Sequence, residues 1–221
     1  MSEVKTNKIS PSSGTTLTLG NSGDNVTGAG GLASVQVFTT LGSQTWTRPT
    51  GVTRVMVEVQ GAGGSGGKRN SNGAAMGGGG GGGYAKKLLD VSSIASATIV
   101  VGAGGATVTS AAAGNDGSDS SWADGTNTIT GAGGTGGPTS SYGSAPGGAG
   151  TNGDLNITGQ TGMTSTYSSG GSSQFGNGGW NTWTGQYTGG DGTGYGSGGG
   201  GGYQSPTGAG AQGIVIVTEY K

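Results

Sequence analysis

The chain has 221 residues, of which 58 are glycine; 9% are charged, and the formal net charge is −1. It contains no cysteine and no histidine, which excludes disulfide staples, Cys/His zinc sites and Ser-His-Asp catalysis. Without a basic patch it lacks the surface that neutralises nucleic-acid phosphates, and no apolar run reaches the length of a membrane span. We therefore expect no enzyme activity, no cofactor or metal, no nucleic-acid partner and no membrane insertion.

A glycine content this high raises two alternatives to a folded domain. Disordered chains usually combine weak hydrophobicity with strong net charge, whereas this chain is almost neutral and has several β-rich segments. Collagen needs glycine at every third position and abundant proline, but the chain has 5 prolines and irregular glycine spacing. Both alternatives are therefore weaker than an ordered glycine-rich fold.

Residues 1–31 form the first predicted unit. Their short β-like rungs, such as Thr16 to Leu19, alternate polar and apolar residues but cannot bury a face alone. We expect an N-terminal attachment and oligomerisation segment that pairs with other chains, with a floppy tail as the alternative.

Residues 32–221 form the second unit, and five of its segments have the composition of β-strands. Residues 54–60 alternate, which places Val55, Val57 and Val59 on one face of a half-buried strand. Residues 35–38, 84–91 and 97–101 are predicted as further strands. The last segment, 213–220, is a nearly continuous β-branched run, typical of a central strand buried on both faces.

Strong strands lie near both ends of this unit, and we expect them to meet in one sheet. An unstructured loop over residues 132–212 would be too long for a compact domain, so the glycine-rich stretches are predicted to be ordered and packed. Residues 77–83 and 198–202 are candidates for local polyglycine helices with three residues per turn. The predicted fold class is all-β: a small β-sandwich base with ordered glycine-rich, partly polyglycine II-like loops, preceded by a short extended N-terminal segment.

Several motifs follow one another in a fixed order: WTRPTGVTRVMVEVQGAGG at 46–64, GGGGGYA at 79–85, IVVGAGG at 99–105 and GIVIV at 213–217. Over roughly residues 36–220 this set resembles the glycine-rich domain of many bacteriophage tail-fibre and adhesin proteins. VKTNKISP at 4–11, with GTTLTLG at 14–20, is similar to an element near the start of fibre proteins of marine, T7-like phages. The resemblance implies a virion protein acting at the distal end of a fibre, where some related adhesins pack polyglycine helices below variable apical loops.

Two motifs could indicate a ligand site, but each matches its pattern only in part. Gly61 to Gly66 satisfies the G-x-G-x-x-G pattern, but no helical period follows that would hold a pyrophosphate. Asp116, Asp119 and Asp124 form an acidic cluster without the spacing of a calcium loop, which favours carboxylates in solvated turns.

The aromatic residues are more informative. Trp46 and Trp122 lie beside strand-like segments and are predicted to serve the core. Seven others lie among Gly, Ser, Thr, Asn and Gln, a composition in which rigid rings supply contact area and small polar residues adapt to a partner. We assign these as receptor-binding candidates, with clamping of the glycine scaffold as the alternative: Tyr142, Tyr167, Phe175, Trp180, Trp183, Tyr187 and Tyr195.

Three functions remain open. The favoured one is a homotrimeric adhesin at a fibre tip that binds a host cell-surface receptor, either a glycan or an outer-membrane protein, and joins other fibre or tail proteins. The second is a purely structural virion component, either a fibre segment or a capsid decoration. The third is an ice-binding protein built on polyglycine helices, although the sequence lacks the regular Thr or Ala face that such a protein needs.

Overall fold

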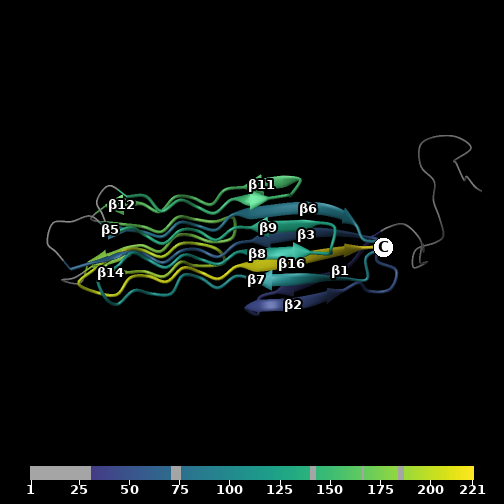
Figure 1. The fold of residues 1–221 in the computed structure, drawn as a ribbon, viewed down its shortest axis with the longest axis horizontal. Helices are drawn as coiled ribbons and strands as arrows, with labels where there is room; N and C mark the ends of the chain where they lie inside the picture. Colours follow the sequence, from purple (N-terminus) through teal and green to yellow (C-terminus); the bar gives the residue numbers. More distant parts are fainter. Residues whose placement is uncertain (1–30, 71–75, 140–142, 166, 184–186) are drawn as a thin grey trace, which may run out of the picture.

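The computed structural model describes residues 31–70, 76–139, 143–165, 167–183 and 187–221. Within them the fold is all-β and elongated, as Figure 1 shows. A base of β-sheets lies at one end, and a bundle of extended segments runs side by side from the base to the opposite end, here called the tip. Residues 1–30, which carry almost all of the predicted attachment segment, lie outside the described residues.

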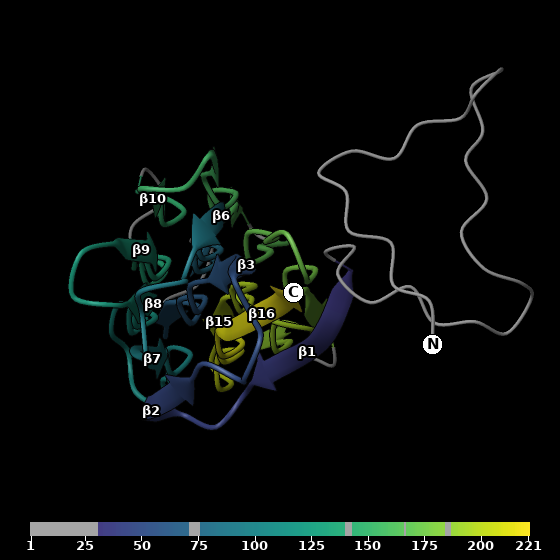
Figure 2. The same cartoon turned by 90° about the vertical axis from the view of Figure 1, so that its right-hand side faces the viewer.

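The base is a sandwich of two five-stranded sheets. In order across the first sheet, the strands are β1 (Leu32–Phe38), β16 (Ile214–Tyr220), β3 (Arg54–Gln60), β6 (Tyr84–Asp90) and β11 (Leu155–Ile157). Across the second they are β10 (Gly150–Thr151), β9 (Thr128–Gly131), β8 (Ser120–Ala123), β7 (Ser96–Val101) and β2 (Gly42–Thr47). Neighbouring strands in both sheets are antiparallel, and Figure 2 looks onto this end of the molecule.

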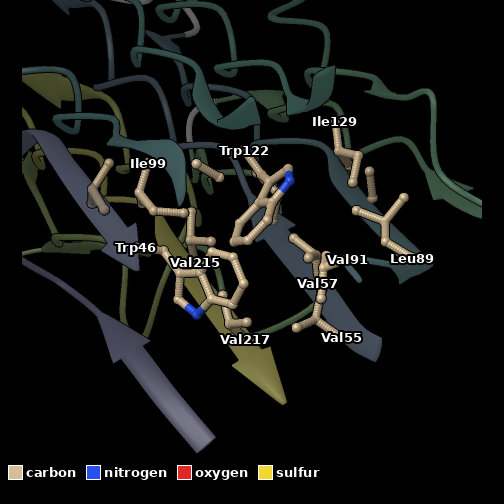
Figure 3. Packing of buried hydrophobic residues seen from close by; sticks show 14 of the residues in the cluster. Trp46, Val55, Val57, Leu89, Val91, Ile99, Trp122, Ile129, Val215 and Val217 are labelled. Atoms are coloured by element: carbon tan, nitrogen blue, oxygen red, sulfur yellow. The ribbon is translucent and has the colours of Figure 1, made fainter. Parts of the chain in front are cut away.

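The core of the base lies between the two sheets. The predicted inward row of β3, Val55, Val57 and Val59, is fully buried there. Trp46 of β2 and Trp122 of β8 are also fully buried, with ring centroids 4.9 Å apart and planes at 53°, and Figure 3 shows them facing the valines of the opposite sheet. The expectation that these two tryptophans serve the core is confirmed.

The last strand lies where the sequence indicates but is fully covered on one side only. β16 pairs with β1 on one edge and β3 on the other, so the ends of the domain do meet in one sheet. The prediction that both faces of this strand are buried was wrong. Val215 and Val217 are buried between the sheets, whereas Ile216 is only partly buried. On the outward side of this strand Ile214, next to the bundle, is buried, whereas Ile216 and Tyr220 stay only partly buried.

One carboxyl group is buried in the base. Glu219 continues the inward row of β16 and is fully buried. Its Oε1 accepts hydrogen bonds of 2.7 Å from Trp46 Nε1 and from Gln36 Nε2, and its Oε2 accepts one from the Ser34 hydroxyl. These three donors offset part of the desolvation cost of the carboxyl group and link both sheets to the last strand.

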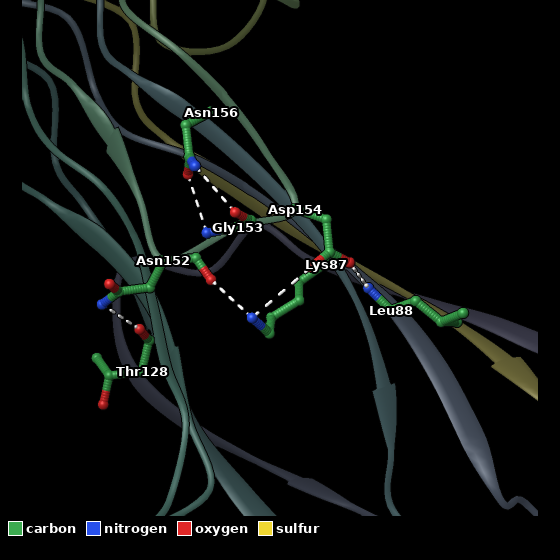
Figure 4. A network of polar contacts seen from close by, with 7 residues as sticks. All are labelled: Lys87, Leu88, Thr128, Asn152, Gly153, Asp154 and Asn156. Carbon is green, nitrogen blue, oxygen red and sulfur yellow. Dashed lines mark hydrogen bonds and ion pairs between the residues drawn. The ribbon is translucent and has the colours of Figure 1, made fainter.

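A polar turn ties the two sheets together at their other edge, where the chain passes from β10 to β11 (Figure 4). Asn152, in the left-handed region with a φ of 62°, donates through its side-chain amide to the Thr128 carbonyl at 2.8 Å. Asp154 accepts from the Leu88 N–H at 3.0 Å and lies 3.8 Å from the Lys87 ammonium. The turn therefore fastens β11 to β6 with side-chain and main-chain contacts.

The bundle is built around the run of seven glycines, residues 77–83. Their N–H groups donate in a repeat of three: residues 77, 80 and 83 to segment 132–138, residues 78 and 81 to 160–163, and residues 79 and 82 to 196–199. Their carbonyls accept from three further segments, 61–67, 148 and 171. A period of three is that of the polyglycine II helix, and six neighbours make this run the hub of a hexagonal packing.

Glycine is required in this hub because the neighbouring main chains lie where a side chain would start. A Cβ on Gly80 would lie 2.1 Å from the Pro146 carbonyl oxygen, and one on Gly79 would lie 2.1 Å from that of Gly64. Overlaps recur at all seven positions, with nearest atoms at 2.0–2.3 Å; these atoms are main chain except at Gly77, where the nearest belongs to the Pro138 ring. The entropy lost by ordering glycine is thus offset by main-chain hydrogen bonds that only glycine permits.

The other predicted glycine segments occupy the same lattice. The N–H groups of residues 61–67 donate in turn to carbonyls of segments 77–83, 112–118 and 208–211. The N–H groups of the G-x-G-x-x-G stretch are therefore hydrogen-bonded to neighbouring helices. Asp116 and Asp119, three residues apart on one helix, accept from the N–H groups of Gly136 and Gly133 at 2.7 and 2.8 Å. These carboxylates thereby satisfy donors at the outer side of the lattice.

Candidate functional site

The tip is where the chain turns between helices of the bundle. The described ends of six connections between neighbouring helices lie there, and by number the connections are 68–76, 109–113, 139–144, 164–167, 182–188 and 203–206. At about 3.1 Å per residue, the seven-residue hub places them roughly 20 Å from the base. A hydrogen-bonded lattice of this depth holds the connections on a rigid support.

Short strand pairs order the described parts of these connections. β4 (Lys68–Arg69) pairs in parallel with β15 (Gly202–Tyr203), and β5 (Met76–Gly77) pairs with β12 (Thr164–Ser165). β13 (Asn181–Trp183) and β14 (Tyr187–Gly189) form a hairpin. Met76 of β5 is buried, and the Ser168 hydroxyl accepts the Gly201 N–H at 2.9 Å.

Three tyrosines form a row across the tip. The rings of Tyr167 and Tyr187 meet edge to face, with centroids 5.5 Å apart, and Tyr187 and Tyr203 lie 6.4 Å apart. Tyr167 is 61% exposed. Partial burial, together with the neighbouring Tyr167 hydroxyl, raises the pKa of the Tyr187 hydroxyl. The Tyr187 phenol therefore stays neutral at physiological pH. The three rings offer hydroxyl groups beside apolar ring faces.

Tyr203 was not among the sequence candidates, and its position depends on pairing that only the fold creates. In the register of β15 and β4 it lies opposite Arg69. The next residue, Gln204, has a φ of 55°, donates from its N–H to the Arg69 carbonyl at 3.0 Å and from its side-chain amide to the Tyr203 hydroxyl at 2.9 Å. A non-glycine residue held in the left-handed region is a local strain that these bonds support.

The remaining predicted candidates fall in different places. Trp180 is 66% exposed, directly precedes the β13 hairpin and bridges to Ser169. The main chain of Trp183 lies in that hairpin, opposite Tyr187. Tyr142 lies outside the described residues.

Phe175 and Tyr195 do not join the tip. They bridge to each other at the junction of bundle and base, and the Phe175 ring packs edge to face on Tyr84 of β6 with centroids 5.6 Å apart. Burial, and then the hydrogen bond to Glu58, raise the pKa of the Tyr84 hydroxyl. This pair therefore lies at the junction of bundle and base, apart from the row of tyrosines.

Two cations, Lys68 and Arg69 of β4, also belong to the tip. Among the described residues of the six connections they are the only ionised side chains, and the sequences of the connections contain no Asp or Glu. They line a hollow of about 370 Å³ together with Asn70, Ala111 and Thr139. A sequence signal did exist: both cations follow a glycine segment directly, in a region of the chain without carboxylates.

The described residues carry no cluster of three or more metal-binding side chains. In the same residues, no helix has the length and apolar character of a membrane span. The acidic cluster is dispersed, because Asp124 accepts from the N–H groups of Thr126 and Asn127 in a turn of the base, away from the lattice contacts of Asp116 and Asp119.

Comparison with known proteins agrees with this architecture. No curated protein matches the chain. The family model described as the glycine-rich domain matches residues 38–220, from the end of β1 to the end of β16, so the chain belongs to the glycine-rich domain family.

Proposed function

We propose that the protein is a phage virion component, a tail-fibre tip adhesin whose tip connections bind a host cell-surface receptor. The observation that carries this proposal is the gathering of the Tyr167, Tyr187 and Tyr203 rings at the end of a rigid lattice, roughly 20 Å from the base. The resemblance of the ordered motifs to phage fibre proteins supplies the virion setting.

The physical logic is preorganisation. Binding loops lose affinity when the partner must order them, because ordering costs conformational entropy. Here the strand pairs and the polyglycine lattice order the described parts of the connections during folding, before a receptor binds. Tyrosine rings supply contact area with little rotamer entropy, while the surrounding Ser, Thr and Asn side chains bond to polar groups of a receptor. A glycan or a loop of an outer-membrane protein fits such a surface.

The base is the end proposed to join the virion. Strand β1 follows residues 1–31 directly, and we propose that this segment assembles the protein as a homotrimer and contacts other fibre or tail proteins. Light scattering of the intact chain should give three times the chain mass of 20.8 kDa. A monomer at micromolar concentration would contradict the assembly proposal.

Adsorption to host cells tests the adhesin function. The purified protein should compete with intact phage for host cells, and the double variants Tyr167→Ala with Tyr187→Ala and Trp180→Ala with Trp183→Ala should weaken attachment by about thirtyfold or more, the effect of losing roughly 2 kcal/mol. Leu155→Ala is the matched control, because Leu155 is 50% exposed on the base. All variants should melt within a few degrees of the wild type.

The same experiment separates the adhesin from a purely structural component. A protein that decorates particles but neither binds cells nor competes with phage is architectural. Tip variants that attach like the wild type, while their stability falls, would show that these rings clamp the scaffold.

A further inference from the structure

The ionised groups of the described chain are distributed unevenly between its ends. The described ion pairs, Lys86 with Glu58 and Lys87 with Asp154, both lie in the base. The carboxylates that belong to the bundle are engaged with main-chain N–H groups: Asp116 and Asp119 as described above, and Asp191 with Ala209 at 2.7 Å. The tip connections hold two cations and no acid.

Lys68 is the more unusual of the two cations, because only 7% of its surface is exposed. Its ammonium donates to the Thr109 carbonyl at 2.6 Å, and among the described residues no other acceptor bonds to it. An ammonium has three donors, and burying it beside a single carbonyl leaves much of its lost hydration unreplaced. A negatively charged group in the adjoining hollow would supply the missing acceptor and the counter-charge.

The hollow has the composition of a sugar-acid site. Lys68 and Arg69 line it beside the amide of Asn70 and the hydroxyl of Thr139, and its volume of about 370 Å³ is in the range of small-ligand pockets. Arg69 of β4 is the register partner of Tyr203 on β15, and Tyr203 belongs to the row with Tyr187 and Tyr167. Cations, an amide and a hydroxyl can bind an acid group and sugar hydroxyls, and the neighbouring ring faces can stack on further sugar rings.

We propose that this hollow binds an acidic sugar, with its carboxylate or phosphate at Lys68 and Arg69 and the continuing saccharide lying along the three tyrosines. The proposal rests on the proposed function as an adhesin and specifies the receptor class as an anionic glycan. A guanidinium binds carboxylate and phosphate with paired hydrogen bonds, while the buried ammonium adds a fixed positive charge.

Titration calorimetry with matched sugars tests the site. Trigalacturonate is compared with neutral galactotriose, and glucose 6-phosphate with glucose, so that each pair differs in its acid group alone; inorganic phosphate is the probe without a sugar. We expect the acidic sugars to bind at least tenfold more tightly than their neutral counterparts. Raising NaCl from about 50 mM to about 500 mM should weaken binding several-fold, because screening shortens the reach of the cations.

Charge variants locate the binding. Arg69→Gln and Lys68→Met should each weaken binding of the acidic sugars at least tenfold, whereas Lys221→Gln, which removes an exposed cation at the base, should leave it unchanged. Arg69→Lys should retain part of the affinity. Because Lys68→Met changes a buried position, its melting temperature is read in parallel, and Arg69→Gln carries the test if that variant fails to fold.

Several outcomes would overturn the proposal. These are failure of both acidic sugars to bind the wild type, equal affinity for neutral and acidic sugars, equal affinity for inorganic phosphate and glucose 6-phosphate, or a folded Arg69→Gln variant that binds like the wild type. The proposed function fails separately. If attachment to cells depends on Tyr167 and Tyr187 but not on Arg69, the adhesin function stands and the acidic ligand is rejected. If the protein binds acidic sugars but does not attach to cells, the sugar site stands and the adhesin function is rejected.

Discussion

Adding one methyl group to the hub of the bundle should nearly unfold the protein. In Gly80→Ala the new Cβ would lie 2.1 Å from the Pro146 carbonyl oxygen and 2.8 Å from that of Ala145, about 1 Å inside normal contact. Both obstacles are main chain, so no side-chain rotamer relieves them. The helix carrying Pro146 must move away from residues 77–83.

The cost follows from the bonds that such a movement breaks. Gly80 donates to the Thr135 carbonyl at 2.8 Å and accepts from Gly64 at 2.9 Å, and Thr135 donates to the Pro146 carbonyl at 3.1 Å. Two or three lost bonds at about 1 kcal/mol each, added to an overpacking cost of about 1–3 kcal/mol, give about 3–6 kcal/mol. That is a large share of the stability of a typical domain.

Urea unfolding of Gly80→Ala and Gly42→Ala, followed by fluorescence, measures this difference. Gly42 has a φ of +88° and an added Cβ there meets nothing within 4 Å, so its replacement costs only the left-handed backbone, about 1–2 kcal/mol. If Gly80→Ala loses no more free energy of unfolding than Gly42→Ala, the helices are not packed on main-chain contact and the lattice argument is wrong.

Three further predictions concern polar groups. Trp46→Phe removes the Nε1 donor of the buried Glu219 carboxyl and should cost about 2–4 kcal/mol in urea unfolding, and a loss below about 1 kcal/mol would contradict this role. Asp116→Ala with Asp119→Ala frees the Gly136 and Gly133 N–H groups to water and should lower stability by about 1–3 kcal/mol; an unchanged urea midpoint would assign these carboxylates to the solvent. Partial burial raises the pKa of the Asp124 carboxyl, but hydrogen bonds from the N–H groups of Asn127 and Thr126 lower it, and the net pKa is lowered. The stabilisation that this carboxylate contributes is therefore present above pH about 4 and lost as pH falls through the folded pKa. Asp124→Asn should therefore flatten the fall of the melting temperature between about pH 5 and pH 3, and equal slopes for variant and wild type would refute the assignment.

The sequence by itself determined the elements whose pattern is local. Alternation in residues 54–60 and the β-branched run at 213–220 predicted β3 and β16, because side-chain burial in a strand repeats every two residues. The seven glycines predicted close main-chain packing, because glycine is favoured where no Cβ fits. Both patterns imply that other segments pack against these residues, but neither specifies which segments.

Only the tertiary structure decided which segments become neighbours. Polyglycine helices with almost no side chains carry little information about their partners, so the six contacts of residues 77–83 could not be inferred from residue types. The aromatic candidates looked alike in composition, yet Tyr167 and Tyr187 lie at the tip, while Phe175 and Tyr195 lie at the base junction. Tyr203 and Arg69 are 134 positions apart by their numbers and meet through strand register, which long-range main-chain pairing sets and local sequence does not.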